Sequence, residues 1–296
     1  MYSTIIRKTL LFATLSGSVT AWSQNTIHKE VSHIVATQHG KVGFYATVIE
    51  TGDTASYNSN NKFPMQSVYK FPIAMAVLKQ VDEGKLSLQQ QIHILPSDIM
   101  PVGHSPIREK YPQGNTDMTL DQIITYNVQE SDGTACDVLL RILGGTAKAN
   151  AYIQKLGIKN INIATTEKAQ QTNDMVQYKN WSTPKAMTTL LKQFYTKPIL
   201  SAGSKAYLLK LMIETPHGAQ RLKGKLPAGT IVAHKTGTSG THNNLTRATN
   251  DAGIITLPNG NHIAITVFVS DSEDSQEQRE GTIAAVAQAA WNQWVK

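Results

Sequence analysis

The chain has 296 residues, of which 41% are hydrophobic, and a formal net charge of +7 at pH 7. This length and composition allow a sizeable core, and the absence of repeats and low-complexity tracts excludes solenoid and disordered architectures. No run of basic residues exceeds two, so the clustered positive stripe typical of nucleic-acid-binding proteins is missing and we expect no nucleic-acid partner.

Residues 1–23 have the three parts of a secretory signal peptide. Arg7 and Lys8 form a basic start, residues 9–20 are mostly apolar, and Ala21-Trp22-Ser23 supplies the small residues that a signal peptidase requires. The apolar run is shorter than the roughly 20 residues of a transmembrane helix. We therefore expect cleavage after this segment, secretion to the bacterial periplasm and no stable membrane anchor. The remaining chain has 26 basic and 21 acidic residues, a net charge of +5.

The first elements are a strand and then helices. Residues 42–50 are rich in β-forming residues and are followed by the turn pair Gly52-Asp53. Residues 67–80 have apolar residues at helical spacing, although Pro72 would remove an amide donor from the second turn. Thr119-Leu-Asp-Gln122 has the spacing of a capping box and predicts a helix start.

The middle of the chain continues with helices and one long loop. Thr134-Ala-Cys-Asp137 repeats the capping signal, and Gly144-Gly145 ends the helix that it opens. Segment 158–181 is polar and irregular, and a loop of that length in a compact chain is usually functional or disordered. Thr183-Pro184 then opens a further helix.

The C-terminal part returns to strands. Residues 229–237, 251–257 and 262–270 are rich in β-forming residues, and Asn259-Gly260 is a hairpin signal between the last two. Residues 274–294 have the spacing of a closing helix. We therefore predict an α/β (α+β) fold with one antiparallel sheet built from both ends of the chain, flanked by helices, and an inserted all-α lobe.

The predicted lobes follow from this order. We expect residues 24–60 and 217–296 to form the α/β lobe, and residues 61–216 to form the all-α lobe with an omega-type loop over 161–181. A cleft between two lobes is a common place for a small-molecule site.

Ser67-Val-Tyr-Lys70 is the first motif that points to chemistry. On a helix, residues three apart share a face, so Lys70 can reach Ser67 near the positive N-terminal end. A serine needs a neighbouring base to become a nucleophile, and a buried lysine can serve as one. The motif alone is short enough to occur by chance at a solvated helix start.

Two further motifs follow. Ser131-Asp132-Gly133 lies in a predicted loop between helices, and Lys235-Thr236-Gly237-Thr238 lies on a predicted strand, where alternate residues face opposite sides. Glycine at 237 lets a ligand or another chain approach the backbone. Each motif alone is also compatible with a turn or an edge strand.

The three motifs together, in this order and with first members 64 and 104 residues apart, are specific. The chain resembles the class A serine β-lactamases over essentially its whole length after residue 23. Residues 63–68, 221–224 and 233–240 are similar to the extended-spectrum branch of PER and VEB enzymes. The resemblance implies the serine β-lactamase and penicillin-binding-protein transpeptidase fold.

The resemblance implies a division of roles among four catalytic residues. Ser67 would be the nucleophile, Lys70 would hold its proton, and Ser131 would pass a proton to the lactam nitrogen. Glu167, 11 residues before Tyr178, would activate the water that hydrolyses the acyl-enzyme. The alternative for Glu167 is a solvated loop carboxylate.

The resemblance also implies the substrate contacts. Lys235 would orient the proton shuttle and attract the substrate carboxylate, which Thr236 and Thr238 would bind along the strand that contains Gly237. The backbone amides of Ser67 and Thr238 would form the oxyanion hole. The remaining expected contact is Arg221, which would hold the carboxylate through its guanidinium or otherwise be a surface arginine.

Three positions depart from the family pattern. Gly133 stands where the family usually has an asparagine that contacts substrate, so substrate affinity and preference are open. Gln171 replaces an asparagine that positions the hydrolytic water. His104 falls where the family often has an aromatic residue at the cleft mouth.

No cofactor or metal is expected. The nine histidines lack the spacing of a zinc site. Cys136, the single cysteine, has helical apolar neighbours and is read as a core residue rather than a nucleophile. We expect a monomer whose ligands are small β-lactams.

Two alternatives share the motifs. A penicillin-binding protein or D-Ala-D-Ala peptidase would deacylate slowly, and a β-lactam sensor would bind without turnover. The expectation is therefore a class A β-lactamase that hydrolyses penicillins and cephalosporins and confers β-lactam resistance, and Glu167 and the lack of a predicted anchor favour it over both.

Overall fold

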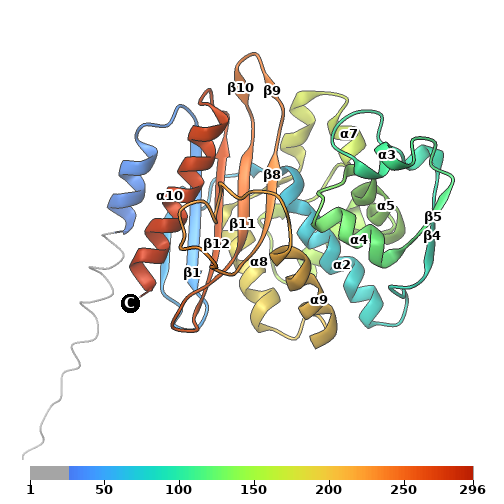
Figure 1. The fold of residues 1–296 in the computed structure, drawn as a ribbon, viewed down its shortest axis with the longest axis horizontal. Coiled ribbons are helices and arrows are strands. Elements are labelled where there is room, and N and C mark those ends of the chain that lie inside the picture. The colour runs from blue at the N-terminus through green and yellow to red at the C-terminus, as the bar shows by residue number, and fades with distance from the viewer. Residues whose placement is uncertain (1–26, 296) are drawn as a thin grey trace, which may run out of the picture.

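The computed structural model describes residues 27–295, so the predicted signal peptide lies outside the described residues. Five antiparallel strands form the central sheet in the order β2-β1-β12-β11-β8 (Figure 1). The prediction that both ends of the chain build one sheet is confirmed, because the N-terminal β1 pairs along its whole length with the C-terminal β12. The strands are β1 Lys41–Val48, β2 Thr54–Tyr57, β8 Val232–Thr238, β11 Thr249–Thr256 and β12 His262–Ser270.

The central sheet has an apolar core on each face. Phe268 of β12 belongs to the core shared with the helical part, whereas its neighbours Val267 and Val269 belong to the core under the terminal helices. This alternation follows from the two-residue period of a strand. β12 is buried along nearly its whole length because helices cover both of its faces.

Two terminal helices cover one face of the sheet. The helix over 27–35 and α10 lie side by side in Figure 1, and their apolar residues share one core. The other face packs on α8, whose Thr188 donates a 3.0 Å hydrogen bond to the Tyr45 carbonyl of β1. These helices are α8 Pro184–Thr196 and α10 Gln276–Trp294.

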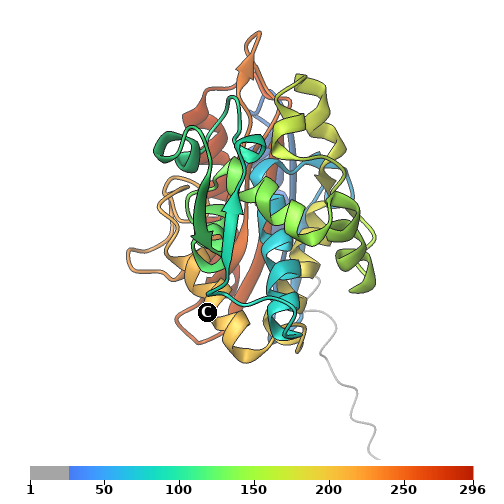
Figure 2. The same cartoon turned by 90° about the vertical axis from the view of Figure 1, so that its right-hand side faces the viewer.

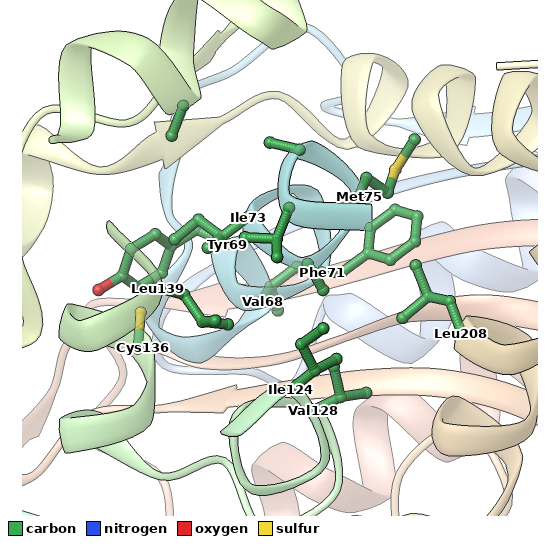
Figure 3. Close-up of a cluster of buried hydrophobic side chains, with 14 of the residues drawn as sticks. Val68, Tyr69, Phe71, Ile73, Met75, Ile124, Val128, Cys136, Leu139 and Leu208 are labelled. Atoms are coloured by element: carbon green, nitrogen blue, oxygen red, sulfur yellow. The ribbon is translucent and has the colours of Figure 1, made fainter. Parts of the chain in front are cut away.

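The helical part is built around α2, which is buried from Lys70 to Leu78 (Figures 2 and 3). The expected helix over 67–80 is present, but α2 itself begins at Lys70 after a 3₁₀ turn. Pro72 therefore lies in the first turn, where amides have no intrahelical acceptor, and it removes no helical hydrogen bond. The helices of this part are α2 Lys70–Asp82, α3 Pro106–Lys110, α4 Leu120–Val128, α5 Gly133–Leu143, α6 Thr146–Lys155 and α9 Ala202–Ile213.

Two of the three predicted caps are confirmed. Thr119 forms a complete capping box with Gln122, and the Thr183 hydroxyl accepts from the third amide of α8. The prediction of Thr134 as a cap is wrong, because Asp132 caps α5 instead. The Asp132 carboxylate also accepts a 2.7 Å hydrogen bond from the Ile107 amide, a tertiary contact that fixes this position as the helix start.

Segment 158–181 is more regular than expected. It contains short elements whose backbone groups are bound by side chains from the same segment and from α5, so its polar composition reflects hydrogen bonding rather than irregular structure. The elements are β6 Ile161–Asn162, α7 Glu167–Gln170, the 3₁₀ helix η3 Asp174–Lys179 and β7 Trp181–Ser182.

The remaining elements are short connections. No helix within residues 27–295 combines the length and apolarity needed to cross a membrane. The short elements are β3 Phe63–Pro64, the 3₁₀ helices η1 Gln66–Tyr69 and η2 Pro96–Asp98, β4 Gln91–Ile94, β5 Thr116–Thr119, β9 Thr241–His242 and β10 Leu245–Thr246.

Candidate active site

Ser67 lies on η1, directly against strand β8. A Cβ atom at Gly237 would lie 2.4 Å from the Met65 carbonyl oxygen and 3.2 Å from the Ser67 nitrogen, so only glycine allows this approach. Asn250 of β11 donates a 3.1 Å hydrogen bond to the same Met65 carbonyl. Together these contacts fix the serine backbone beside the end of β8.

Lys70 is the centre of the site. Its ammonium donates to Ser67 Oγ at 2.9 Å and to the Ser131 carbonyl at 2.6 Å. It also lies 3.1 Å from Glu167 Oε1, an ion pair without hydrogen-bond alignment. Lys70 is only 1% exposed, so these contacts replace its lost hydration. The structure therefore brings three separate parts of the chain together at one cation, namely residues 67–70, Ser131 and Glu167.

Ser131 lies between two lysines. Its φ of +57° is left-handed, and its carbonyl accepts from Lys70 while its hydroxyl accepts from Lys235 Nζ at 2.8 Å. Lys235 is fully buried, and this burial, together with the charge of Lys70, lowers the pKa of Lys235 to about 7. A lysine with such a pKa can hold or release a proton near neutral pH.

Glu167 is the first residue of α7, and hydrogen bonds to backbone amides fix its position. The Glu167 and Lys168 amides donate to the two carboxylate oxygens of Asp137 at 2.7 and 2.9 Å. Burial raises the pKa of Asp137 to about 6. Asn180 binds the chain just before α7, with its Oδ1 accepting from the Thr165 amide at 2.9 Å. The side chain of Glu167 is 9% exposed and points to Lys70.

Arg221 is buried rather than on the surface. Its Nε pairs with Glu280 at 3.1 Å, and its Nη1 donates to the Gly237 carbonyl at 3.2 Å and the Asn250 carbonyl at 2.9 Å. Its Nη2 donates to Thr238 Oγ1 at 2.7 Å. The guanidinium therefore orients the end of β8 as well as facing the cavity.

Gly133 and His104 lie next to each other. A Cβ atom at Gly133 would meet Met100 at 3.1 Å and the His104 carbonyl at 3.3 Å, so this loop occupies the space beside Gly133. The His104 ring bonds the Glu130 carbonyl at 2.8 Å and stacks edge-on with His217 at 5.9 Å between centroids. His104 precedes α3 and His217 follows α9, so the ring contact joins two segments of the cavity wall that are distant in sequence.

The site opens into a cavity of about 920 Å³. Gln171 is exposed and lines this cavity. Its side chain lies against Gly103, because a Cβ atom built at Gly103 would be 3.2 Å from Gln171 Nε2. The other lining residues that were predicted are Ser67, Lys70, His104, Ser131, Glu167, Arg221, Thr236 and Thr238.

Sequence reasoning missed Gln170, which also lines the cavity. It is 8% exposed, and its Nε2 donates to the Tyr69 hydroxyl at 3.3 Å. Gln170 and Gln171 are adjacent amides in an irregular-looking stretch, and no sequence pattern distinguishes the buried one from the exposed one.

Cys136 is a buried core residue, as predicted. Burial raises its pKa well above the usual range, which keeps the thiol protonated. Figure 3 shows its sulfur beside the Tyr69 hydroxyl. Within residues 27–295, no group of three or more His, Cys, Asp or Glu side chains is arranged to hold a metal ion.

Comparisons with known proteins match this geometry. The model of the β-lactamase enzyme family matches residues 26–294. The β-lactamase VEB-1 of Pseudomonas aeruginosa is 42% identical over 90% of this chain and 89% of its own length. The extended-spectrum β-lactamase PER-1 of the same organism is 40% identical over 97% of this chain and 93% of its own length.

Solved structures agree. A β-lactamase from Chitinophaga pinensis superposes with a TM-score of 0.88 at 49% identity, covering 90% of this chain and 99% of that one. The TLA-1 extended-spectrum β-lactamase superposes with a TM-score of 0.91 at 44% identity, covering 93% of this chain and 100% of that one. The chain belongs to the β-lactamase enzyme family, as a class A serine enzyme.

Proposed function

We propose that this β-lactamase hydrolyses penicillins and cephalosporins through an acyl-enzyme on Ser67 that Glu167 deacylates. The observation that carries the proposal is the position of Lys70 Nζ, 2.9 Å from Ser67 Oγ and 3.1 Å from Glu167 Oε1. One buried cation thus connects the nucleophile to a carboxylate that can receive its proton.

Acylation begins with attack of Ser67 Oγ on the lactam carbonyl carbon. The serine proton leaves toward the Lys70–Glu167 pair, and the developing oxyanion is received by the backbone amides of Ser67 and Thr238. The lactam C–N bond then breaks, and the nitrogen takes a proton from Ser131 Oγ. Lys235, 2.8 Å from that oxygen, resupplies the proton.

Substrate recognition rests on the carboxylate that β-lactams carry. Lys235 supplies positive charge, and the Thr236 and Thr238 hydroxyls donate to the carboxylate beside Gly237. Arg221 already donates to Thr238 Oγ1, so that hydroxyl keeps its own proton for the substrate. His104 and Gln171 line the cavity and would contact the substrate side chain, and Gly133, whose amide donates to the His104 carbonyl, would support that part of the wall.

An extended substrate spectrum and a periplasmic location belong to the same proposal. The similarity to PER-1 and TLA-1 and the cavity of about 920 Å³ support the spectrum. The signal-peptide pattern of residues 1–23 supports secretion, and the enzyme would act there as a monomer that protects the cell from β-lactams. The two lobes, 24–60 with 217–296 and 61–216, would enclose the substrate.

Replacement of the nucleophile tests the proposal. The Ser67→Ala variant should lose turnover of a penicillin and a cephalosporin by more than about 10⁴-fold, because no other group on the reaction path can form the ester. Steady-state hydrolysis measures the loss, while the melting temperature and equilibrium binding of the β-lactam should be retained. Turnover that survives in Ser67→Ala would place the chemistry elsewhere.

A further inference from the structure

The turn that contains Ser131 is held by side chains from distant parts of the chain. It follows α4, and the carbonyls at the end of a helix have no intrahelical donor. Three successive carbonyls of the turn each receive a donor from elsewhere. These hydrogen bonds run from Thr215 Oγ1 to the Gln129 carbonyl at 3.0 Å, from the His104 ring to the Glu130 carbonyl at 2.8 Å, and from Lys70 Nζ to the Ser131 carbonyl at 2.6 Å.

The backbone of Ser131 needs this support. Its φ of +57° lies in the left-handed region, which is unfavourable for a residue with a side chain. Such a conformation persists only where the surrounding structure fixes it. The same residue supplies the hydroxyl, 2.8 Å from Lys235 Nζ, that gives its proton to the lactam nitrogen in the proposed acylation. The direction of this hydroxyl therefore depends on the contacts that hold the turn.

His104 contacts the turn on both sides of Ser131. Its ring Nε2 donates to the Glu130 carbonyl, and its own carbonyl accepts from the Gly133 amide at 3.1 Å. Because a carbonyl oxygen can only accept, the proton of the neutral His104 ring lies on Nε2. The ring also meets His217 edge-on, with the centroids 5.9 Å apart. These contacts give the ring a defined orientation, in which its N–H faces the backbone beside Ser131.

A ring at this position could also act by packing on the substrate. His104 lines the cavity and is exposed, so a bound β-lactam can reach the face of the ring. An apolar ring would serve that purpose equally well, whereas the contact to Glu130 requires a donor. The two roles therefore differ in which part of His104 matters, the ring face or the Nε2–H group.

We propose that His104 is a positioning residue for Ser131. It acts through the Glu130 carbonyl and holds the turn so that Ser131 Oγ meets the lactam nitrogen as the C–N bond breaks. Ser131 gives its proton to that nitrogen and Lys235 returns one to Oγ, so His104 itself neither gains nor loses a proton. The effect is confined to acylation, because Glu167 activates the water for deacylation. This assignment rests on the proposed role of Ser131 as the proton shuttle.

Two variants separate the roles of the His104 ring and its donor. His104→Phe keeps a ring that can contact His217 and the substrate, and it removes the donor. His104→Gln loses the ring but keeps an N–H donor as many bonds from the backbone as Nε2. We expect His104→Phe to lower the acylation rate about fivefold, within the range of one hydrogen bond, and His104→Gln to acylate within about twofold of the native rate. Deacylation should be native in both variants.

A double-mutant cycle tests whether His104 acts through Ser131. Ser131→Ala alone should slow acylation by about a hundredfold or more, because the proton donor to the lactam nitrogen is lost. Adding His104→Phe to Ser131→Ala should then change acylation by less than about twofold, since the hydroxyl that His104 positions is absent. A ring that only stabilised the fold or contacted the substrate would give the same loss in both backgrounds.

Rapid mixing with a chromogenic cephalosporin measures acylation and deacylation separately. Because His104 is exposed, the fold should tolerate both changes, and the melting temperature of each variant checks this. Native acylation in His104→Phe, an equal loss in His104→Gln, or a loss that persists in the Ser131→Ala background would overturn the proposal. Native acylation in Ser131→Ala would instead overturn the proposed function of Ser131.

Discussion

Two buried lysines share the site, and their contacts give them different tasks. Lys70 has a carboxylate partner in Glu167 at 3.1 Å, whereas Lys235 donates to the Ser131 hydroxyl and the Thr236 carbonyl, which are neutral. Burial and the charge of Lys70 therefore lower the pKa of Lys235 to about 7. In the free enzyme, the charge of Lys235 is present below pH 7 and is lost above it.

The charge of Lys235 predicts a basic limb in the pH profile. The kcat/KM value for a carboxylate-bearing β-lactam reports ionisation in the free enzyme. It should fall by about tenfold or more as pH rises through 7, because the substrate carboxylate loses a charged partner. The matched control is the methyl ester of the same β-lactam. A limb that is equally deep with the ester would assign it to a different group.

Several site residues could be predicted from the sequence because they lie in local motifs. Ser67 and Lys70 are spaced as neighbours on one face of a helix, and Lys235 belongs to a strand motif with Thr236. Ser67 and Lys70 line the cavity, and Lys235 donates to Ser131, which lines it too. Gln170 and Asn250 could not be predicted, because what selects them is a partner distant in sequence. No periodicity is readable in a helix of four residues.

At the scale of elements, the segment from β6 to β7 depends on one side chain. Asn180 is fully buried, and its amide accepts from the Ala164 and Thr165 nitrogens and donates to the Thr165 carbonyl at 2.8 Å. Asn180 therefore replaces the hydrogen bonds that a longer strand or helix would supply. This is why a polar segment without a periodic pattern has a defined shape before Glu167.

Removal of this side chain should destabilise the fold. Asn180→Ala removes the partners of three backbone groups, of which the two on Thr165 are buried, and should lower the free energy of unfolding by about 3 kcal/mol, at about 1 kcal/mol for each bond. Asn162→Ala in the same segment removes one exposed hydrogen bond to the Lys179 carbonyl and should cost less than about 1 kcal/mol. Urea unfolding measures both, and equal losses would contradict the role assigned to Asn180.

The predicted helix caps were confirmed where no neighbouring side chain competed for the capping position. Thr119 and Thr183 cap their helices because nothing nearby competes for those positions. Asp132 replaces Thr134 as a cap because its carboxylate also binds the Ile107 amide, and Thr134 Oγ1 accepts from Met100 instead. A sequence contains both caps but not the tertiary contact that chooses between them.

At the scale of the molecule, one sheet separates two cores. Strand β12 contributes Phe268 to the core of the helical part and Val267 and Val269 to the core under α10. The two cores therefore share a backbone layer, and neither can unfold without exposing apolar residues of the other. The overall architecture was predictable from strands at both ends and helices between them.

This shared layer predicts one cooperative unfolding transition. Trp181 of β7 reports on the helical part, and Trp291 of α10 reports on the opposite face. Fluorescence of Trp181→Phe and of the double variant Trp291→Phe with Trp294→Phe should each give a urea transition coincident with the loss of secondary structure in that same variant. A fluorescence transition separate from the loss of secondary structure in either protein would show that the two parts unfold independently.

The most direct test of the account is the fate of the acyl-enzyme when Glu167 is removed. Native protein and Glu167→Ala are each mixed with a chromogenic cephalosporin and quenched at successive times. The intact protein mass is then measured by mass spectrometry. The account predicts steady turnover by the native protein, and in the variant a burst of one equivalent with a stable adduct on Ser67. Continued turnover by Glu167→Ala without an adduct would contradict the central role of Glu167.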